Sequence, residues 1–112
     1  MSNLMLETWE ILEHNGKEVS DIKWVGSKDF SIGIDEFIKL ANREYDDGYG
    51  GQEVAQDLVV VGDDWWLERH DYDGSEWWEF KTLPQKPAQK RTINTLFTDS
   101  GWETLRRIND EP

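Results

Sequence analysis

The chain has 112 residues, which leaves room for one domain with its own core. It carries 24 acidic and 12 basic side chains, for a net charge of −12. It has no cysteine, so disulfides, thiolate zinc sites and thiol nucleophiles are excluded. The charge opposes direct binding to nucleic acid, and no apolar run approaches the roughly 18 residues of a membrane span. We therefore expect a single compact domain over residues 1–112, located in the cytoplasm and without a membrane partner.

The negative charge is concentrated in the first 80 residues. Residues 1–80 hold 20 acidic and 6 basic side chains, whereas residues 81–112 hold 4 acidic and 6 basic ones. Pro84 and Pro87 lie at the change, so residues 83–90 are expected to form a connecting loop. The seven tryptophans argue against disorder despite the charge.

Two amphipathic helices are predicted in the first half of the chain. The first begins at Leu4, behind a cap by Ser2 or Asn3, and stops at Asn15-Gly16. A short strand is expected over 21–26. The second helix is expected over 35–46, ended by the glycine run of 48–51, and residues 52–56 could add a helical turn. The apolar stripe of this second helix comprises Phe37, Leu40, Ala41 and Tyr45.

A β-hairpin is the clearest feature of the middle of the chain. Asp73-Gly74 separates two aromatic-rich runs, 65–72 and 75–81, and such a pair is typical of a two-residue turn. The resulting register places Arg69 opposite Trp78 on one face. On the other face the opposed pairs are Glu68 with Glu79, His70 with Trp77, and Trp66 with Lys81.

A third strand over 58–61 would join this hairpin through a tight turn at Gly62-Asp63. This turn places Val60 opposite Trp65 and Leu58 opposite Leu67, so both turns direct the aliphatic residues to one face. A fourth strand is expected over 91–97. Ser100 and Glu103 form a capping box that opens a last helix, with Trp102, Leu105 and Ile108 facing inward. The predicted fold is α+β: a small antiparallel meander of three to four strands with two to three helices packed on one face.

The run DLVVVGDDWWLERHDYDGSEWWEF, at residues 57–80, resembles a signature of small uncharacterised phage and prophage proteins of Gram-positive bacteria. Residues 19–25 and 48–51 add to the resemblance. It implies a phage-type origin and no particular activity or functional residue. Small acidic phage proteins are often inhibitors of host defence systems, which is an association and not a mechanism.

No cofactor, metal or catalytic residue is predicted. His70 is interpreted as a surface histidine stacked on Trp77, and His14 as a cation at a helix end. The Asp-rich turns lack the calcium-loop pattern, and the 48–51 run lacks the lysine of a phosphate loop. Glu68 and Glu79 could share a proton, which would raise the pKa of one of them, but a flat sheet offers no cleft for catalysis.

The paired tryptophans carry the most distinctive signal. Adjacent strand residues point to opposite faces, so each pair directs one tryptophan inward and one outward. An outward aromatic surface indicates an interface, unless a loop or the last helix covers it. The residues expected to bind a partner are Trp66, Trp77, Tyr72, His70, Glu68, Glu79, Asp63 and Asp64.

Three functions remain open from the sequence. The first is an anti-CRISPR-like inhibitor that binds a basic host protein, such as a CRISPR effector nuclease or a restriction enzyme, in place of nucleic acid. The second is a phage structural or assembly protein, or self-association as a homodimer through the aromatic face. The third is a small ligand-binding module whose tryptophans stack on sugars or bases.

Overall fold

The structure is a computed structural model that describes residues 2–46, 48 and 51–110. Its helices and strands are β1 (Ser2–Asn3), α1 (Leu4–His14), the 3₁₀ helix η1 (Val19–Asp21), β2 (Trp24–Gly26), β3 (Ser31–Ile32), α2 (Ile34–Ala41), β4 (Glu44–Tyr45), β5 (Val59–Val61), β6 (Trp65–Tyr72), β7 (Ser75–Thr82) and α3 (Leu105–Asp110). The strands form a five-stranded antiparallel sheet in the order β3-β2-β5-β6-β7 and a two-stranded one, β1-β4. The α+β class is confirmed, with a larger sheet than predicted.

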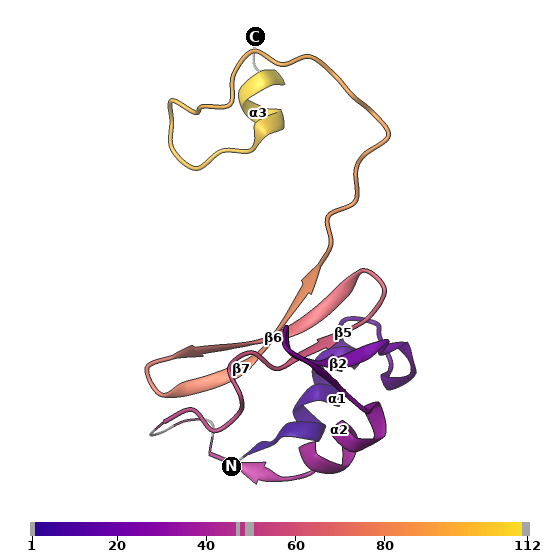
Figure 1. Cartoon of the computed structure of the whole chain (residues 1–112). Helices are drawn as coiled ribbons and strands as arrows, with labels where there is room; N and C mark the ends of the chain where they lie inside the picture. Colours follow the sequence, from indigo (N-terminus) through magenta and orange to yellow (C-terminus); the bar gives the residue numbers. More distant parts are fainter. Residues whose placement is uncertain (1, 47, 49–50, 111–112) are drawn as a thin grey trace.

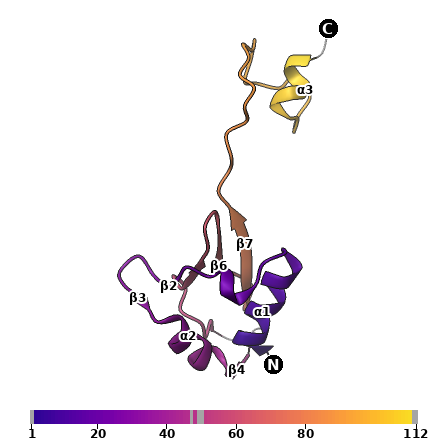
Figure 2. The same cartoon turned by 90° about the vertical axis from the view of Figure 1, so that its right-hand side faces the viewer.

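Helices α1 and α2 lie on one side of the five-stranded sheet (Figures 1 and 2). This covered side is called the inner face below, and the opposite side the outer face. The buried core between the helices and the sheet comprises Leu12, Ile22, Val25, Phe37, Ala41, Val60, Trp65, Leu67 and Trp78. The inward direction of Val60, Trp65, Leu67 and Trp78 was predicted from strand alternation and is confirmed.

The β6–β7 hairpin has the predicted register along its whole length. Tyr72 pairs with Ser75, Arg69 with Trp78, and Trp65 with Thr82. The turn needs left-handed backbone at both central residues, and Asp73 and Gly74 have φ angles of 52° and 87°. The Asp-Gly dipeptide therefore sets which tryptophan of each pair faces inward.

The register between β5 and β6 differs by two residues from the prediction. Val60 pairs with Leu67, because the turn has Asp63-Asp64 at its centre and is closed by the Gly62 N–H on the Trp65 carbonyl, at 2.8 Å. A side chain at Gly62 would place its Cβ 2.1 Å from the Trp65 ring, so this position requires glycine. A shift of two residues keeps every side chain on its predicted face.

The first helix is confirmed, since the Asn3 side chain caps it and Gly16, with φ 72°, ends it. The second is shorter than predicted, because residues 44–45 pair with β1 and leave the helix. Tyr45 is therefore buried in β4 and Leu40 is exposed. Residues 52–56 are not helical. The run of 48–51 was expected to end the helix, and its residues Tyr49 and Gly50 lie outside the described residues. Asp47, just before it, also lies outside them.

Within the predicted 21–26 strand, only Trp24–Gly26 is paired as a strand, and Asp21 instead ends η1. The expected strand over 91–97 is absent from the structure, where residues 83–104 are irregular. The expected helix begins later, at Leu105, with the Thr104 hydroxyl accepting the Arg107 N–H at 3.1 Å. Glu103 pairs with Arg107 at 2.9 Å. The prediction of a capping box formed by Ser100 and Glu103 was therefore wrong.

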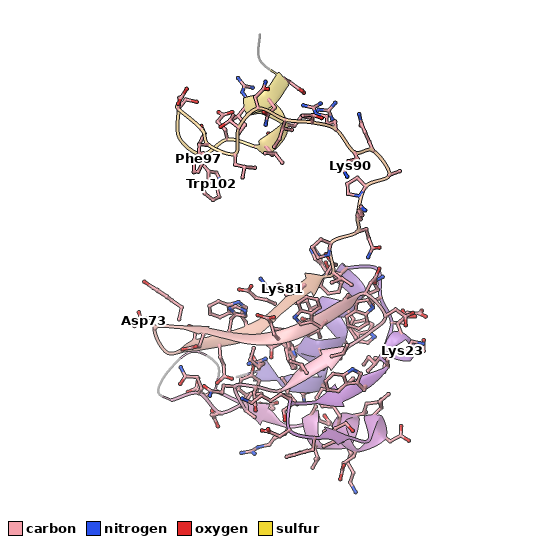
Figure 3. The ribbon with its side chains drawn as sticks, turned by 45° about the horizontal axis from the view of Figure 1, so that its top comes forward. Lys23, Asp73, Lys81, Lys90, Phe97 and Trp102 are labelled. Carbon is pink, nitrogen blue, oxygen red and sulfur yellow. The ribbon has the colours of Figure 1, made fainter. Side chains whose placement is uncertain are left out.

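The C-terminal segment, residues 83–110, extends away from the sheet (Figure 1). Trp102 and Leu105, which were expected to face inward, are exposed, and Trp102 is fully open to solvent. Ile108 is half-buried. Phe97 and Trp102 lie far from the sheet in Figure 3. The Cα radius of gyration is 18.8 Å, against roughly 13 Å for a compact chain of this length. The core is thus complete without this segment.

Candidate protein-binding face

The outer face of the sheet brings together side chains from β2, β5, β6 and β7. One row across the strands runs from Trp24 through Val61 and Trp66 to Lys81, and the next holds Val59, Glu68 and Glu79. His70 and Trp77 form a third row, and Tyr72 ends the face beside the turn. Six of the predicted binding residues therefore lie on one face: Trp66, Glu68, His70, Tyr72, Trp77 and Glu79.

Each outward tryptophan donates a hydrogen bond to the glutamate two residues further along its own strand. The Trp66 indole N–H bonds the Glu68 carboxylate at 2.7 Å, and that of Trp77 bonds Glu79 at 3.1 Å. Residues two apart in a strand lie on the same face, so the Trp-x-Glu spacing produces this bond twice. Both indoles are held over the sheet with their polar edges satisfied.

Two basic side chains lie against the paired carboxylates. The Nε2 atom of His70 is 2.6 Å from Glu68 and its Nδ1 atom is 3.7 Å from Glu79. The ammonium of Lys81 is 3.2 Å from Glu79. The sequence interpretation of His70 was stacking on Trp77; the contacts that the structure gives it are with Glu68 and Glu79, which face each other across the hairpin.

The expectation of a raised pKa in the Glu68–Glu79 pair was wrong. The indole of Trp66, followed by His70, lowers the pKa of Glu68. The indole of Trp77, followed by Lys81, lowers the pKa of Glu79. Hydrogen bonds to the charged form outweigh the desolvation that would raise both pKa values, so both carboxylates stay ionised. A carboxylate accepts about four hydrogen bonds, so both keep acceptor capacity for a partner.

Tyr72 and the two remaining predicted residues, Asp63 and Asp64, lie at the edges of the face. Tyr72 is 68% exposed near the Asp73-Gly74 turn. Asp63 and Asp64 are exposed in the β5–β6 turn, beside the row of Trp24 and Trp66, where Asp63 lies 3.8 Å from Lys23. The carboxylates of these two aspartates add negative charge beside the outer face, beyond the ends of the strands.

Sequence reasoning missed Trp24 as part of this face. Trp24 is 39% exposed and pairs with Val61, which places it next to Trp66. Alternation with the buried Val25 is the signal that could have assigned it. The face therefore carries three tryptophans, and Trp24 is the most exposed of them.

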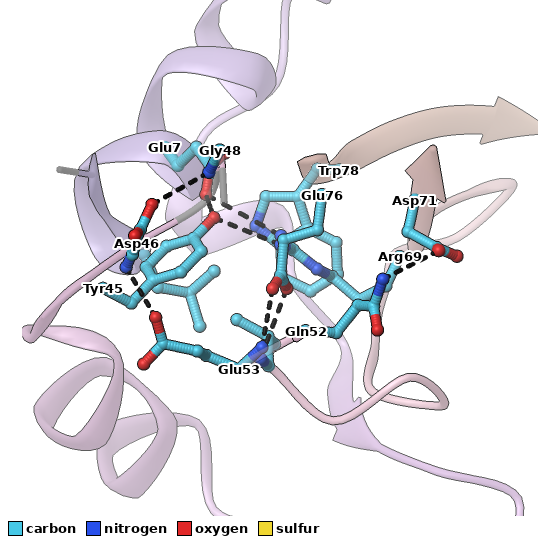
Figure 4. Close-up of polar contacts among 12 residues, drawn as sticks. Glu7, Tyr45, Asp46, Gly48, Gln52, Glu53, Arg69, Asp71, Glu76 and Trp78 are labelled. Atoms are coloured by element: carbon cyan, nitrogen blue, oxygen red, sulfur yellow. Dashed lines mark hydrogen bonds and ion pairs between the residues drawn. The ribbon is translucent and has the colours of Figure 1, made fainter. Parts of the chain in front are cut away.

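A buried ion cluster fixes the hairpin from the inner face (Figure 4). The guanidinium of Arg69, whose side chain is 3% exposed, donates to Glu76 at 2.9 Å and to the Tyr45 hydroxyl at 3.1 Å. Glu76 also accepts the backbone N–H groups of Glu53 and Val54, at 2.6 and 3.2 Å. This carboxylate therefore ties the 51–57 loop to the hairpin.

Tyr45 and Glu7 complete the cluster. The Tyr45 hydroxyl donates to the Glu7 carboxylate, which lies 3.7 Å from Nη1 of Arg69. Burial first, and the bond to Glu7 second, raise the pKa of Tyr45 well above its usual range. Because every charged member has a partner in the core, we interpret this cluster as structural and the outer face as the candidate site.

Metal-ligand clusters and membrane-spanning helices are both absent from the described part of the chain. Among the described residues, no group of three or more His, Cys, Asp or Glu side chains could hold a metal ion. No helix there is long and apolar enough to cross a membrane. Comparison with family models, curated proteins and solved structures found no match to this chain. The phage-type resemblance stays a prediction.

Proposed function

We propose that this chain is an acidic binding protein that docks, through the outer face, on a basic nucleic-acid-binding protein and blocks its nucleic-acid channel. The observation that carries the proposal is the Glu68–Glu79 pair, ionised and flanked by two tryptophans. Rigid aromatic side chains are typical interface anchors, and fixed carboxylates suit arginine and lysine side chains that otherwise hold phosphates.

The charge of the whole chain supports the same partner class. A net charge of −12 steers the protein toward basic surfaces and away from nucleic acid. The partner's channel must neutralise many phosphates and is therefore rich in lysine and arginine. The acidic residues near the face supply the rim, and Trp24, Trp66 and Trp77 supply the apolar centre.

The proposed partners are a CRISPR effector nuclease or a restriction enzyme of a bacterial host, in the cytoplasm. This part of the proposal rests on the resemblance of residues 57–80 to phage and prophage proteins. Binding without catalysis is sufficient for such a role, because occupation of the channel excludes DNA or guide RNA.

Equilibrium binding of the purified chain to a panel of such effectors tests the proposal. We expect binding that competes with DNA or guide RNA and weakens steeply as salt is raised. The double variant Glu68→Gln, Glu79→Gln should bind at least about tenfold more weakly. The matched control, Asp35→Asn with Glu36→Gln, removes the same charge from the exposed first turn of α2 and should bind nearly as the natural chain does. Undetectable binding at low salt, or equal losses in both variants, would refute the proposal.

A further inference from the structure

Strand β7 forms one edge of the five-stranded sheet. It is eight residues long, and among the described strands it pairs only with β6. The opposite edge is the two-residue strand β3. A long edge strand presents a row of backbone donors and acceptors that can pair with another strand.

The turn geometry shows which backbone groups face this edge. A two-residue turn is closed by a hydrogen-bonded pair, here Tyr72 with Ser75, and bonded and non-bonded pairs then alternate along the hairpin. Consistent with this alternation, the Leu83 N–H points back to the Asp64 carbonyl at 2.7 Å. The N–H and C=O groups of the even-numbered residues 76, 78, 80 and 82 therefore point away from β6.

We infer that this edge binds a second copy of the chain, with the two β7 strands antiparallel and centred on Phe80. In this register Phe80 forms a hydrogen-bonded pair with its counterpart, and Trp78 pairs with Thr82 of the second copy. The five-stranded sheets of the two chains then join in one continuous sheet of ten strands. This inference goes beyond the proposed function and does not depend on it.

Charge selects this register over its neighbours. Centred on Phe80, Glu79 lies directly opposite Lys81 of the second copy, and the two-fold symmetry forms this pair twice. Centring on Glu79 opposes two glutamates, and centring on Trp78 places Lys81 opposite Ser75. Opposite charges across strands are favourable and like charges are not, so the Phe80 register is preferred.

The same register gives an apolar partner to an exposed side chain. Leu83 is 57% exposed and follows β7 directly, and strand alternation places it on the outer face. In the dimer it lies opposite Trp77 of the second copy. The two outer faces become adjacent across the two-fold axis, so each dimer presents two copies of the candidate binding face side by side.

Sedimentation of single and mixed charge variants at physiological ionic strength tests the inference. The natural chain should dimerise. Glu79→Lys and Lys81→Glu each oppose like charges in the dimer and should weaken self-association about tenfold or more. An equimolar mixture restores both opposite-charge pairs and should form heterodimers. The control, Lys39→Glu on the exposed end of α2, should dimerise as the natural chain does.

A backbone variant tests the edge without charge. The Thr82 N–H points away from β6, so Thr82→Pro removes an outward donor and no bond of the hairpin. At a concentration where both chains are monomeric, this variant should keep the unfolding midpoint of the natural chain, and at higher concentration it should fail to dimerise. A natural chain that stays monomeric at millimolar concentration, or single charge variants that dimerise normally, would overturn the inference.

The two proposals fail independently. Higher salt screens the repulsion between two chains of charge −12 and should strengthen self-association, whereas it weakens docking on a basic partner. The dimer is also measured on the chain alone. Absence of an effector partner therefore leaves the β7 inference standing, and a monomeric chain leaves the proposed function standing.

Discussion

Arg69 and Trp78 lie directly opposite each other on the inner face of the hairpin, with the guanidinium carbon 4.8 Å from the centre of the indole ring. Among the described residues, Nε and Nη1 of Arg69 have no hydrogen-bond partner. Contact with the negative face of the indole partly compensates for this. The Trp78 N–H in turn donates to the Thr8 hydroxyl at 2.9 Å, so this pair connects the hairpin to α1.

Removing the Arg69 charge should be among the most destabilising changes in the chain. Arg69→Met leaves Glu76 buried without its cation, which costs about 3–5 kcal/mol. The double variant Arg69→Met, Glu76→Leu removes both charges and should recover part of this loss. Urea denaturation measures both free energies of unfolding. A single variant within about 0.5 kcal/mol of the natural chain would contradict the buried cluster.

Tyr45 should make stability fall at alkaline pH. Its pKa is raised in the folded chain, so the unfolded state loses this proton first, and stability is lost as pH rises above roughly 10. Tyr45→Phe should lower stability at neutral pH and flatten the decline above pH ~10. Denaturant midpoints across this range measure the slope, and an unchanged slope would argue against a protonated, buried Tyr45.

The tryptophan donors should control the two outer carboxylates separately. Trp66→Phe removes the largest cause of the lowered Glu68 pKa, so this pKa should rise toward its ordinary value while that of Glu79 moves little. Trp77→Phe should do the reverse. Because both pKa values are depressed, the stability that these groups contribute is present above pH ~4.3 and is lost as pH falls through the folded values. Carboxyl carbon NMR titrations follow each group.

Gly62→Ala should disrupt the β5–β6 turn, since the added methyl would lie 2.1 Å from the Trp65 ring in the core. We expect the free energy of unfolding to fall by at least about 2 kcal/mol. Gly51→Ala, where the methyl meets nothing within 4 Å, should change stability little. Thermal unfolding midpoints of the two variants compare the two sites. Equal midpoints would mean that Gly62 does not lie against the Trp65 ring.

Removal of residues 84–112 should leave the fold intact. The buried core residues all precede residue 79, and Leu83, whose N–H bonds Asp64, is retained. The truncated chain should unfold cooperatively within about 1 kcal/mol of the full chain. A molten or aggregated product would show that the C-terminal segment packs on the sheet in solution.

Local turn chemistry and alternation made the hairpin predictable from sequence. Asp73-Gly74 admits one tight turn, and that turn assigns every outward residue from Trp66 to Glu79. The β5–β6 register was less accessible, because it depends on how closely the Trp65 ring packs on Gly62, which is a tertiary contact. Glu76 lies in the same hairpin as Arg69, so the hairpin register brings the two side chains together, whereas Glu7 reaches Arg69 only after α1 has packed on the sheet.

The place of Trp24 and the expected strand over 91–97 were also mispredicted, because both depend on contacts between distant parts of the chain. Trp24 joins the outer face through pairing of a three-residue strand with β5, and so short a strand leaves little periodic signal. The weak alternation over 91–97 predicted a strand, yet this segment has no neighbouring edge to pair with in the structure. A strand forms only where a partner supplies its backbone hydrogen bonds.

Hydroxyl-radical footprinting of the chain bound to an effector nuclease shows whether the outer face is the binding surface, because it reports tryptophan oxidation residue by residue. Binding through the outer face should slow the oxidation of Trp24, Trp66 and Trp77. The exposed Trp9 on α1 provides an internal reference and should react at the same rate in both states. Protection of Trp9 together with unchanged oxidation of the three outer tryptophans would show that the partner does not bind the outer face.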